Sequence, residues 1–457
     1  MALAINRRTV RAMAVLWMAA WCGMVPPAFP AQPDPIKDAR LAFERHQFER
    51  VLQLVDPLLA VDGAPLDARR LKIKSLVRLA KPADALVEYE RLEAMTGSED
   101  QPLLREVAIG FITPLLKDMR EQMRGAAYTA LKELDSDESI PYFEDGLSDG
   151  AGLVRALAAE GLGRRASGRR SVRLRKAMDD QAAIVRTAAL KALGRSQDRS
   201  DMTLVESALK DDQPMVRATA AAVLVKFGRS EFLPRVRAAA EARNPEERAV
   251  GLRLLGDLRD REALPILQRA LKDGQPSVRG AAAVALGDLG APADGAALAV
   301  LLEDPIPAVR ASAALGLGEL HAADSQPALQ KACQDGNPAV RAAAIAALLH
   351  LGAPYQDVAD RARELTHNPD PGIRATAARA LGKSRDPEAI ERLKLLLEDQ
   401  LPRPRIAAAR ALGQIGGEAI ISILKNALHD RDDAVRATAG GALGRILPAD
   451  GNPLKTK

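Results

Sequence analysis

The sequence predicts an all-α fold, an α-solenoid (superhelix) built from about eleven two-helix repeats of 31 residues. An arginine recurs eleven times, in steps of 31 residues with one step of 33, and a leucine follows each arginine by seven residues. Alanine follows by three residues in ten of the eleven repeats. A fixed period in this range is typical of stacked units that bury their apolar faces against one another. The repeat arginines are Arg124, Arg155, Arg186, Arg217, Arg248, Arg279, Arg310, Arg341, Arg374, Arg405 and Arg436.

The composition is that of a folded helical protein. Of the 457 residues, 47% are hydrophobic and 27% are charged, but only 3% are aromatic, so alanine and leucine fill the apolar positions. The formal net charge is +5, yet residues 1–31 hold three arginines and no acid, which leaves 62 basic and 60 acidic residues in the remainder. Because this remainder is nearly balanced, we expect no nucleic-acid partner.

Residues 1–31 have the pattern of a signal peptide. Arg7, Arg8 and Arg11 precede an apolar run over 12–25, and PPAFPA follows. The run is shorter than the roughly 20 residues of a membrane-spanning helix. We therefore predict an exported chain, periplasmic or associated with the cell envelope, and an uncleaved N-terminal anchor is the alternative. Beyond this segment Cys333 is the only cysteine, so packing without disulfides must hold the fold.

Residues 32–100 lack the repeat arginine but keep a helical pattern. Val51 and Val55 are followed 34 residues later by Ala85 and Tyr89, a spacing that resembles tetratricopeptide repeats. A plain helical cap over the exposed end of the array is the alternative, because terminal repeats need covering. The polar segment over 96–102 gives the predicted boundary with the array.

Residues 101–446 form the predicted array, and a tail follows over 447–457. Each repeat has a shorter first helix and a second helix that carries the arginine. Positions −1, +3 and +7, counted from the arginine, fall on one helical stripe and should be buried. Proline at −3 in seven repeats suits the first turn of this helix. Glycine at +8 in eight repeats is expected to end the helix in left-handed geometry.

An aspartate stands at position −6 in nine of the eleven repeats. It can share charge-assisted hydrogen bonds with the arginine within and between repeats. This pairing, with the VR…A…ALG helix, resembles HEAT repeats of the phycobilisome-lyase type over about three quarters of the chain. The resemblance implies that the arginine helices line the concave side and that the Asp–Arg pairs form a structural ladder. Its central members here are Asp273, Arg279, Asp304, Arg310, Asp335 and Arg341.

Two enzyme classes share such repeats. Deoxyhypusine hydroxylases bind two irons through His-Glu pairs just after the arginine, but this sequence has no His-Glu dipeptide, and its five histidines have no spacing that gathers metal ligands. Bilin lyases, which load a chromophore onto an antenna protein, have no short signature to test and stay an alternative, although their task is cytoplasmic. We expect no enzymatic activity, no cofactor and no metal, and interpret the chain as a scaffold for protein–protein interaction.

The variable positions of the arginine helix indicate where a partner would bind. Positions +1 and +5 should face the concave groove; +1 is small nearly throughout, whereas +5 varies. In the middle of the array the +5 residues are apolar, and arginines flank them. We predict a groove for an extended peptide or helix with an apolar centre and acidic flanks; an unselected surface is the alternative. The predicted groove residues are Arg253, Val284, Leu315, Ala346, Arg379 and Arg410.

One stretch, RRASGRRSVRLRK over 164–176, holds seven positive charges and no acid. A solvated loop would explain it, and the sharper interpretation is contact with an acidic partner or anionic lipid headgroups. The stretch has no aromatic residues for base stacking, which disfavours single-stranded nucleic acid. The candidate residues are Arg164, Arg165, Arg169, Arg170, Arg173, Arg175 and Lys176.

Overall fold

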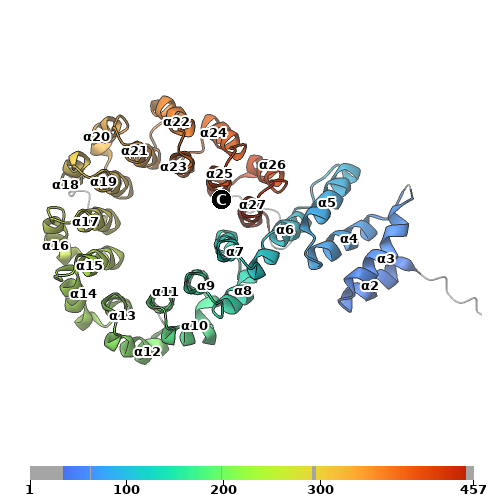
Figure 1. Cartoon of the computed structure of the whole chain (residues 1–457), viewed down its shortest axis with the longest axis horizontal. Helices are drawn as coiled ribbons and strands as arrows, with labels where there is room; N and C mark the ends of the chain where they lie inside the picture. Colours follow the sequence, from blue (N-terminus) through green and yellow to red (C-terminus); the bar gives the residue numbers. More distant parts are fainter. Residues whose placement is uncertain (1–33, 62, 197, 291–294, 449–457) are drawn as a thin grey trace, which may run out of the picture. The chain divides into compact units, whose positions relative to one another are not determined.

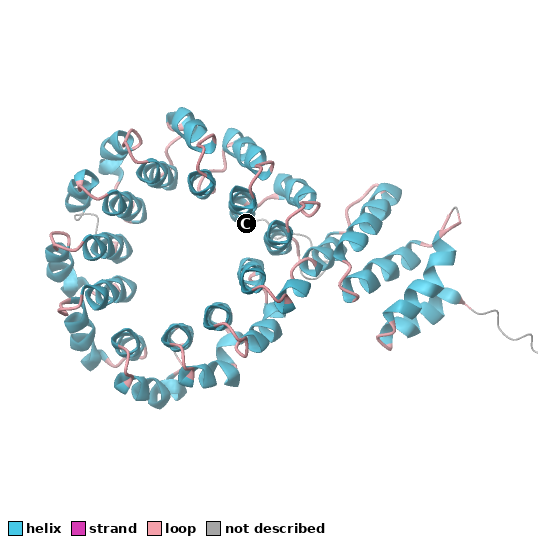
Figure 2. Ribbon diagram, viewed as in Figure 1, coloured by secondary structure: helices cyan, strands magenta, loops and turns pink. Residues whose placement is uncertain are grey.

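The computed structural model describes residues 34–448, apart from 62, 197 and 291–294. Every regular element in this described part is a helix, which confirms the predicted all-α fold (Figure 2). The predicted signal peptide over 1–31 and the tail from residue 449 lie outside the described residues. The chain divides into two compact units between Ser75 and Leu76.

The first unit contains α2 (Pro35–Glu44), α3 (Phe48–Leu59) and most of α4 (Leu66–Arg78). The side chain of Asp34 accepts hydrogen bonds from the amides of Ile36 and Lys37 and thereby begins α2. α2 packs on α3. The small buried core of this unit consists of Ala39, Ala42, Val51, Val55 and Ala68.

The division between the units lies 25 residues before the boundary predicted at residue 100. The first tetratricopeptide-like segment therefore lies in the first unit, whereas the second is α5 (Pro82–Thr96) in the second unit. α5 packs on α6 (Gln101–Gly110). The buried faces of both segments agree with the pattern, since Val51, Val55, Ala85 and Tyr89 are fully buried. Whether they are true tetratricopeptide repeats stays a prediction.

The second unit has two layers of helices (Figure 1). The helices that carry the repeat arginines form the inner layer, which is the side expected from the resemblance to HEAT repeats. Shorter helices form the outer layer. The inner helices are α7 (Glu121–Leu134), α9 (Gly152–Arg164), α11 (Ala183–Gly194), α13 (Pro214–Lys226), α15 (Pro245–Leu258), α17 (Pro276–Leu289), α19 (Pro307–Glu319), α21 (Pro338–His350), α23 (Pro371–Leu381), α25 (Pro402–Ile415) and α27 (Asp433–Ile446). The outer helices are α8 (Ile140–Gly146), α10 (Val172–Lys176), α12 (Met202–Ser207), α14 (Leu233–Ala240), α16 (Leu264–Ala270), α18 (Gly295–Val300), α20 (Gln326–Ala332), α22 (Ala359–Thr366), α24 (Pro387–Leu397) and α26 (Glu418–Ala427).

The predicted buried stripe is present. All eleven +7 leucines, from Leu131 to Leu443, are at most 1% exposed. The seven prolines at −3 each occupy the first residue of an inner helix, as predicted, where a missing backbone N–H costs no intrahelical bond. Removal of these leucines from water is the main gain from stacking, at about 2 kcal/mol for each side chain.

The prediction for the +8 glycines is wrong. None of them has a positive φ; the left-handed residues that follow the inner helices stand at +11 instead, for example Gly290 and His321. The +8 glycines are needed for close approach between neighbouring inner helices. A Cβ on Gly256 would lie 2.8 Å from the Cα of Ala285, and one on Gly287 would lie 2.9 Å from the Cα of Gly316. Contact with the next repeat, and not a helix end, explains the glycine.

The repeat arginines form the predicted ladder between repeats. Arg310 donates from Nε to Asp335 Oδ2 at 2.7 Å and from Nη2 to Asp335 Oδ1 at 2.9 Å, while its Nη1 donates to the carbonyl of Asp304 at 2.8 Å. The Arg310 guanidinium lowers the pKa of Asp335. Each bidentate pair thus joins one inner helix to the turn before the next one. The pairs are Arg124–Asp149, Arg155–Asp180, Arg186–Asp211, Arg248–Asp273, Arg279–Asp304, Arg310–Asp335, Arg374–Asp399 and Arg405–Asp430.

The ladder changes at two places where the next repeat lacks the aspartate. Arg217 precedes the repeat with Ala242 at −6, and it donates to the carbonyls of Asp211 and Asp212. Arg341 precedes the longer, 33-residue step, and its Nη2 donates to Glu364 Oε1 at 2.9 Å. At both places the repeat arginine has no aspartate 25 residues ahead, and its bidentate pair to the next repeat is absent.

The last inner helix packs against the first. α27 contacts both α7 and α6, so the row of inner helices returns to its start (Figure 1). We call this junction the seam. The last repeat is the only one with glycine at +4 and +5. A Cβ on Gly440 would clash with the carbonyl oxygen of Ala108 on α6, and one on Gly441 with that of Ala130 on α7. These two glycines let the backbones meet.

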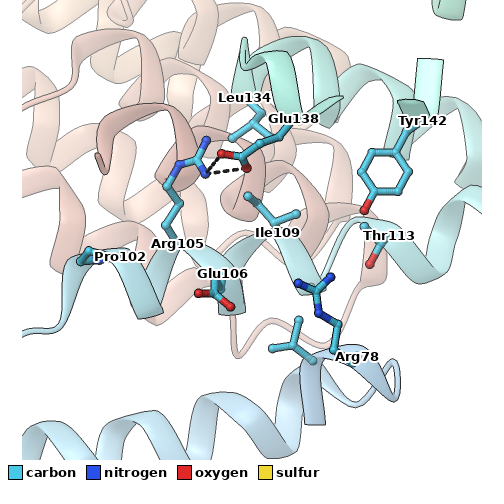
Figure 3. Close-up of a pocket in the computed structure, with 11 residues that line it drawn as sticks. Arg78, Pro102, Arg105, Glu106, Ile109, Thr113, Leu134, Glu138 and Tyr142 are labelled. Atoms are coloured by element: carbon cyan, nitrogen blue, oxygen red, sulfur yellow. Dashed lines mark hydrogen bonds and ion pairs between the residues drawn. The ribbon is translucent and has the colours of Figure 1, made fainter. Parts of the chain in front are cut away.

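A buried arginine also joins the two ends at the seam. Arg105 on α6 is 5% exposed and donates from Nε to the carbonyl of Gly444 on α27 at 3.0 Å. Its Nη1 donates to both carboxylate oxygens of Glu138, at 2.8 and 2.7 Å (Figure 3). Arg105 lies at the wall of a cavity of about 520 Å³. The charge of Arg105 is thus compensated where it joins the two ends.

Further ion pairs cross the seam. Lys425 Nζ on α26 lies 2.7 Å from Glu93 Oε1 on α5, and Arg410 Nε on α25 lies 3.1 Å from Glu133 Oε1 on α7. The seam therefore combines backbone contact, a buried arginine and ion pairs, as the regular junctions between repeats do.

We expect Arg310→Ala to lower the free energy of unfolding by about 2 kcal/mol, because Asp335 then loses two charge-assisted hydrogen bonds in a mostly buried site. The side chains of this pair are 17% and 12% exposed. The matched control is Lys331→Ala, whose ion pair with Glu303 is 77% and 69% exposed and should contribute little. Urea unfolding followed by circular dichroism measures both. Equal losses in the two variants would contradict a stabilising ladder.

Candidate partner-binding surface

The predicted groove residues form one row. They lie at the same position of six successive inner helices, from α15 to α25. Leu315 is 46% exposed, although Ala313 and Leu317 on the same helix are fully buried. Val284 and Ala346 beside it are partly exposed. The structure therefore presents an apolar strip on three adjacent inner helices, with Arg253 exposed at one end.

The arginines at the other end differ from one another. Arg410 lies against Glu133 across the seam. Arg379 is exposed and donates from Nη2 to Thr376 Oγ1 at 2.6 Å. Burial, with Arg403 and Arg410 nearby, lowers the pKa of Arg379. Among the described residues no carboxylate lies within ion-pair distance of Arg379 or Arg403. This part of the inner surface carries uncompensated positive charge.

A row of carboxylates, which is not among the predicted groove residues, borders the apolar strip. Asp257, Asp288 and Glu319 stand at +9 on α15, α17 and α19, one turn beyond the groove residues, and all three are exposed. Burial raises the pKa of Asp288, and the charges of Asp257 and Glu319 raise it further. The regular spacing of three acids at one repeat position was the signal that could have revealed this row.

A second apolar row was also missed. Leu153, Ile184 and Met215 stand at −2 on α9, α11 and α13, and they are 54%, 48% and 38% exposed. Position −2 is two turns before +5 and on the same face of the helix, so this row also lies on the inner side. The sequence signal was three large apolar residues in succession at a position that varies elsewhere.

The basic stretch over 164–176 is largely paired with acids that the local sequence did not show. Arg164 lies 3.2 Å from Asp135, Arg165 lies 2.8 Å from Asp137, and Arg173 lies 2.8 Å from Asp145. Arg175 Nε lies 2.6 Å from Asp201 Oδ1. The acids belong to neighbouring repeats. These pairs favour the structural interpretation, and binding of an anionic surface by this stretch stays a prediction.

Within the described ranges no three His, Cys, Asp or Glu side chains are grouped so that they could hold a metal ion. Cys333 is buried, and burial raises the pKa of its thiol to about 11, so the reactive thiolate is scarce at neutral pH. In the same ranges, no helix combines the length and the apolar character needed to cross a membrane.

Comparison with protein families identifies the class of repeat. HEAT repeats match residues 110–194, 171–250, 233–305, 295–368, 351–403 and 391–454. These segments cover well over half of the chain, so the protein belongs to the HEAT-repeat family. This confirms the resemblance found in the ladder and the VR…A…ALG helix. A search of the curated proteins found no match.

Solved structures include similar helical arrays. The complex of CpcE and CpcF of phycocyanin lyase from a Nostoc species is 22% identical, and the match covers 52% of this chain and 91% of that one with a TM-score of 0.37. Human deoxyhypusine hydroxylase is 22% identical over 55% of this chain and 97% of that one, with a TM-score of 0.30. Kap121p bound to Nup53p is 15% identical over 95% of this chain and 56% of that one, with a TM-score of 0.34.

The raised pKa of Asp288 leads to a prediction about stability. Because the folded state binds this proton more tightly than the unfolded state, the ionised carboxylate destabilises the fold at neutral pH. Asp288→Asn should therefore leave the melting temperature at pH 7 unchanged or slightly higher, and any gain should vanish below the ordinary carboxyl pKa of about 4.

Asp335→Asn is the opposite control, since the pKa of Asp335 is lowered by Arg310. Its melting temperature should fall at pH 7, and the loss should shrink as the pH falls below about 4. Thermal unfolding at both pH values measures the differences. A clear loss of stability in Asp288→Asn at pH 7 would show that the carboxylate row is not repulsive.

Proposed function

We propose that this chain is a non-enzymatic scaffold that binds a protein or peptide partner along its inner helical face. The observation that carries the proposal is the row at +5. Leu315 is 46% exposed between Val284 and Ala346, although the residues at +3 and +7 of the same three helices are buried. An exposed apolar strip on a concave face, with charges at its border, is the usual anatomy of a protein-binding surface.

The charges along the strip specify the chemistry of the partner. Apolar side chains of the partner would cover Val284 and Leu315, and acidic residues of the partner would lie near Arg253 and Arg379 at the ends of the strip. The carboxylate row that includes Asp288 favours a basic group of the partner along one edge. A cation there would offset the burial and the neighbouring charges that raise the pKa of Asp288. The partner is thus amphipathic, with both signs of charge in fixed places.

Replacing the strip tests the proposal. The double variant Val284→Glu with Leu315→Glu should weaken partner capture at least tenfold, because two apolar contacts are lost and two charges must be desolvated. The measurement is a pull-down from cell-envelope extract with the tagged full chain, quantified by mass spectrometry of the captured proteins.

Leu395→Glu is the matched control. Leu395 is a 55% exposed leucine on the outer helix α24, so the same substitution is made away from the inner face. This variant should capture partners as the wild type does. Loss of capture in both variants, or in neither, would contradict the inner strip as the binding surface. A purified chain that holds iron or a visible chromophore would contradict the scaffold itself.

We further propose that the chain works in the cell envelope. The support is the pattern of residues 1–31, with its basic start and short apolar run. Cell fractionation followed by mass spectrometry of the purified chain tests this. The protein should appear in the periplasmic or envelope fraction, with an N-terminus after residue 31 if the segment is cleaved. A cytoplasmic chain with residues 1–31 intact would overturn the assignment.

A further inference from the structure

The seam borders an open pocket that no single end of the array contains. A cavity of about 490 Å³ is lined by α7 and α9 from the start of the array and by α25 and α27 from its end. Its apolar wall includes Leu153 and Leu157 on α9 and Ile406 on α25. Leu157 and Ile406 are distant in sequence, so this wall exists only while the ends are joined.

The apolar surface continues out of the pocket. Leu153 lines the pocket, and Ile184 and Met215 follow it at the same position of the next two inner helices. Neighbouring packed helices lie about 8–10 Å apart. An extended polyproline II peptide advances about 9 Å in three residues and returns to the same face. A peptide with an apolar side chain at every third residue therefore matches the spacing of Leu153, Ile184 and Met215.

The charge beside the pocket is positive on the α25 side. Arg410 lines the pocket but is offset by Glu133. Arg379 and Arg403 on α23 and α25 have no carboxylate of the described chain within ion-pair distance. Burial, with the charge of Arg403 nearby, lowers the pKa of Arg379. Glu121 lies on the opposite, α7 wall and is exposed. An acidic group at the α25 end of a bound peptide would compensate the two free arginines.

We propose that the seam pocket receives an apolar side chain of an extended acidic peptide, whose acidic residues lie against Arg379 and Arg403 and whose further apolar side chains, one in three, cover Ile184 and Met215. The inference rests on the proposed function, in that the inner face binds a peptide. It adds a second apolar site, which lies on different inner helices from Leu315 and shares Arg379 with the first strip, and it makes binding depend on the closed seam.

The test uses a defined probe and the full chain. The probe is a fluorescein-labelled peptide with two aspartates followed by three leucines, each separated from the next by two prolines. Fluorescence anisotropy should show saturable binding to the wild type. Leu153→Glu with Ile184→Glu should weaken it at least tenfold, and the Leu395→Glu control should leave it unchanged. No binding to the wild type, or equal binding to the double variant, would overturn the proposal.

Charge reversal tests the role of the two arginines through a gain of binding as well as a loss of binding. Arg379→Glu with Arg403→Glu should weaken binding of the aspartate peptide and strengthen binding of the same peptide with two lysines. Both side chains are exposed, so folding should be retained, and circular dichroism checks this. If the two peptides bind the wild type equally well, the acidic preference is wrong.

Opening the seam tests the composite nature of the pocket. Gly441→Leu places a side chain against the Ala130 carbonyl and should part α27 from α7, which small-angle X-ray scattering would detect as a larger radius of gyration. The probe should then bind at least tenfold more weakly. Unchanged binding to an opened chain would contradict a pocket shared by both ends.

One further variant separates this inference from the proposed function. Val284→Glu with Leu315→Glu should leave probe binding unchanged, because those residues do not line the seam pocket. If this variant abolishes probe binding while Leu153→Glu with Ile184→Glu does not, the probe occupies the Leu315 strip and the seam site is refuted. If the probe binds at the seam but envelope proteins are captured regardless of Leu315, the proposed function fails and the seam site stands.

Discussion

The bidentate pair between the arginine of one repeat and the aspartate of the next is the interaction on which the rest of the structure depends. Apolar burial stacks the helices but does not specify how far one slides or turns against the next. Two parallel hydrogen bonds from Nε and Nη2, with Nη1 on a backbone carbonyl, fix both, as Arg310 shows with Asp335 and Asp304. Where the aspartate is missing, Arg217 keeps only the backbone carbonyls of its own turn, and Arg341 donates instead to Glu364.

Small residues set the second constraint, which is the distance between inner helices. The glycines at +8 bring the backbone of one helix against the next, as Gly287 does with Gly316. The last repeat applies the same device at new positions. Gly440 and Gly441 admit the backbones of α6 and α7, and Arg105 then caps the carbonyl of Gly444. An open array must cover the apolar faces of its first and last helices. Here α7 and α27 bury these faces against each other within the second unit.

The inner helices present variable side chains on their concave face. Positions −2, +5 and +9 differ along the row, and in several repeats their side chains are exposed on the inner face. Leu315 and its neighbours form one apolar strip with carboxylates at its edge, and Leu153, Ile184 and Met215 form another with arginines near one end. The two strips lie on different inner helices, and only the first has a row of carboxylates along its edge, so one scaffold offers two chemically distinct surfaces.

The repeat, the helix pairs, the buried leucines and the arginine–aspartate ladder were predictable from the sequence, because each depends on spacing within 31 residues that is repeated eleven times. The strip around Leu315 was predictable for the same reason. The role of the +8 glycines, the partners of Arg164 to Arg175 and the pairing of Arg410 with Glu133 were not, since each depends on a contact with another repeat. The seam was the least predictable feature. Whether the two ends meet is decided by the sum of small rotations over all repeats, and no single repeat encodes that sum; only the tertiary structure shows it.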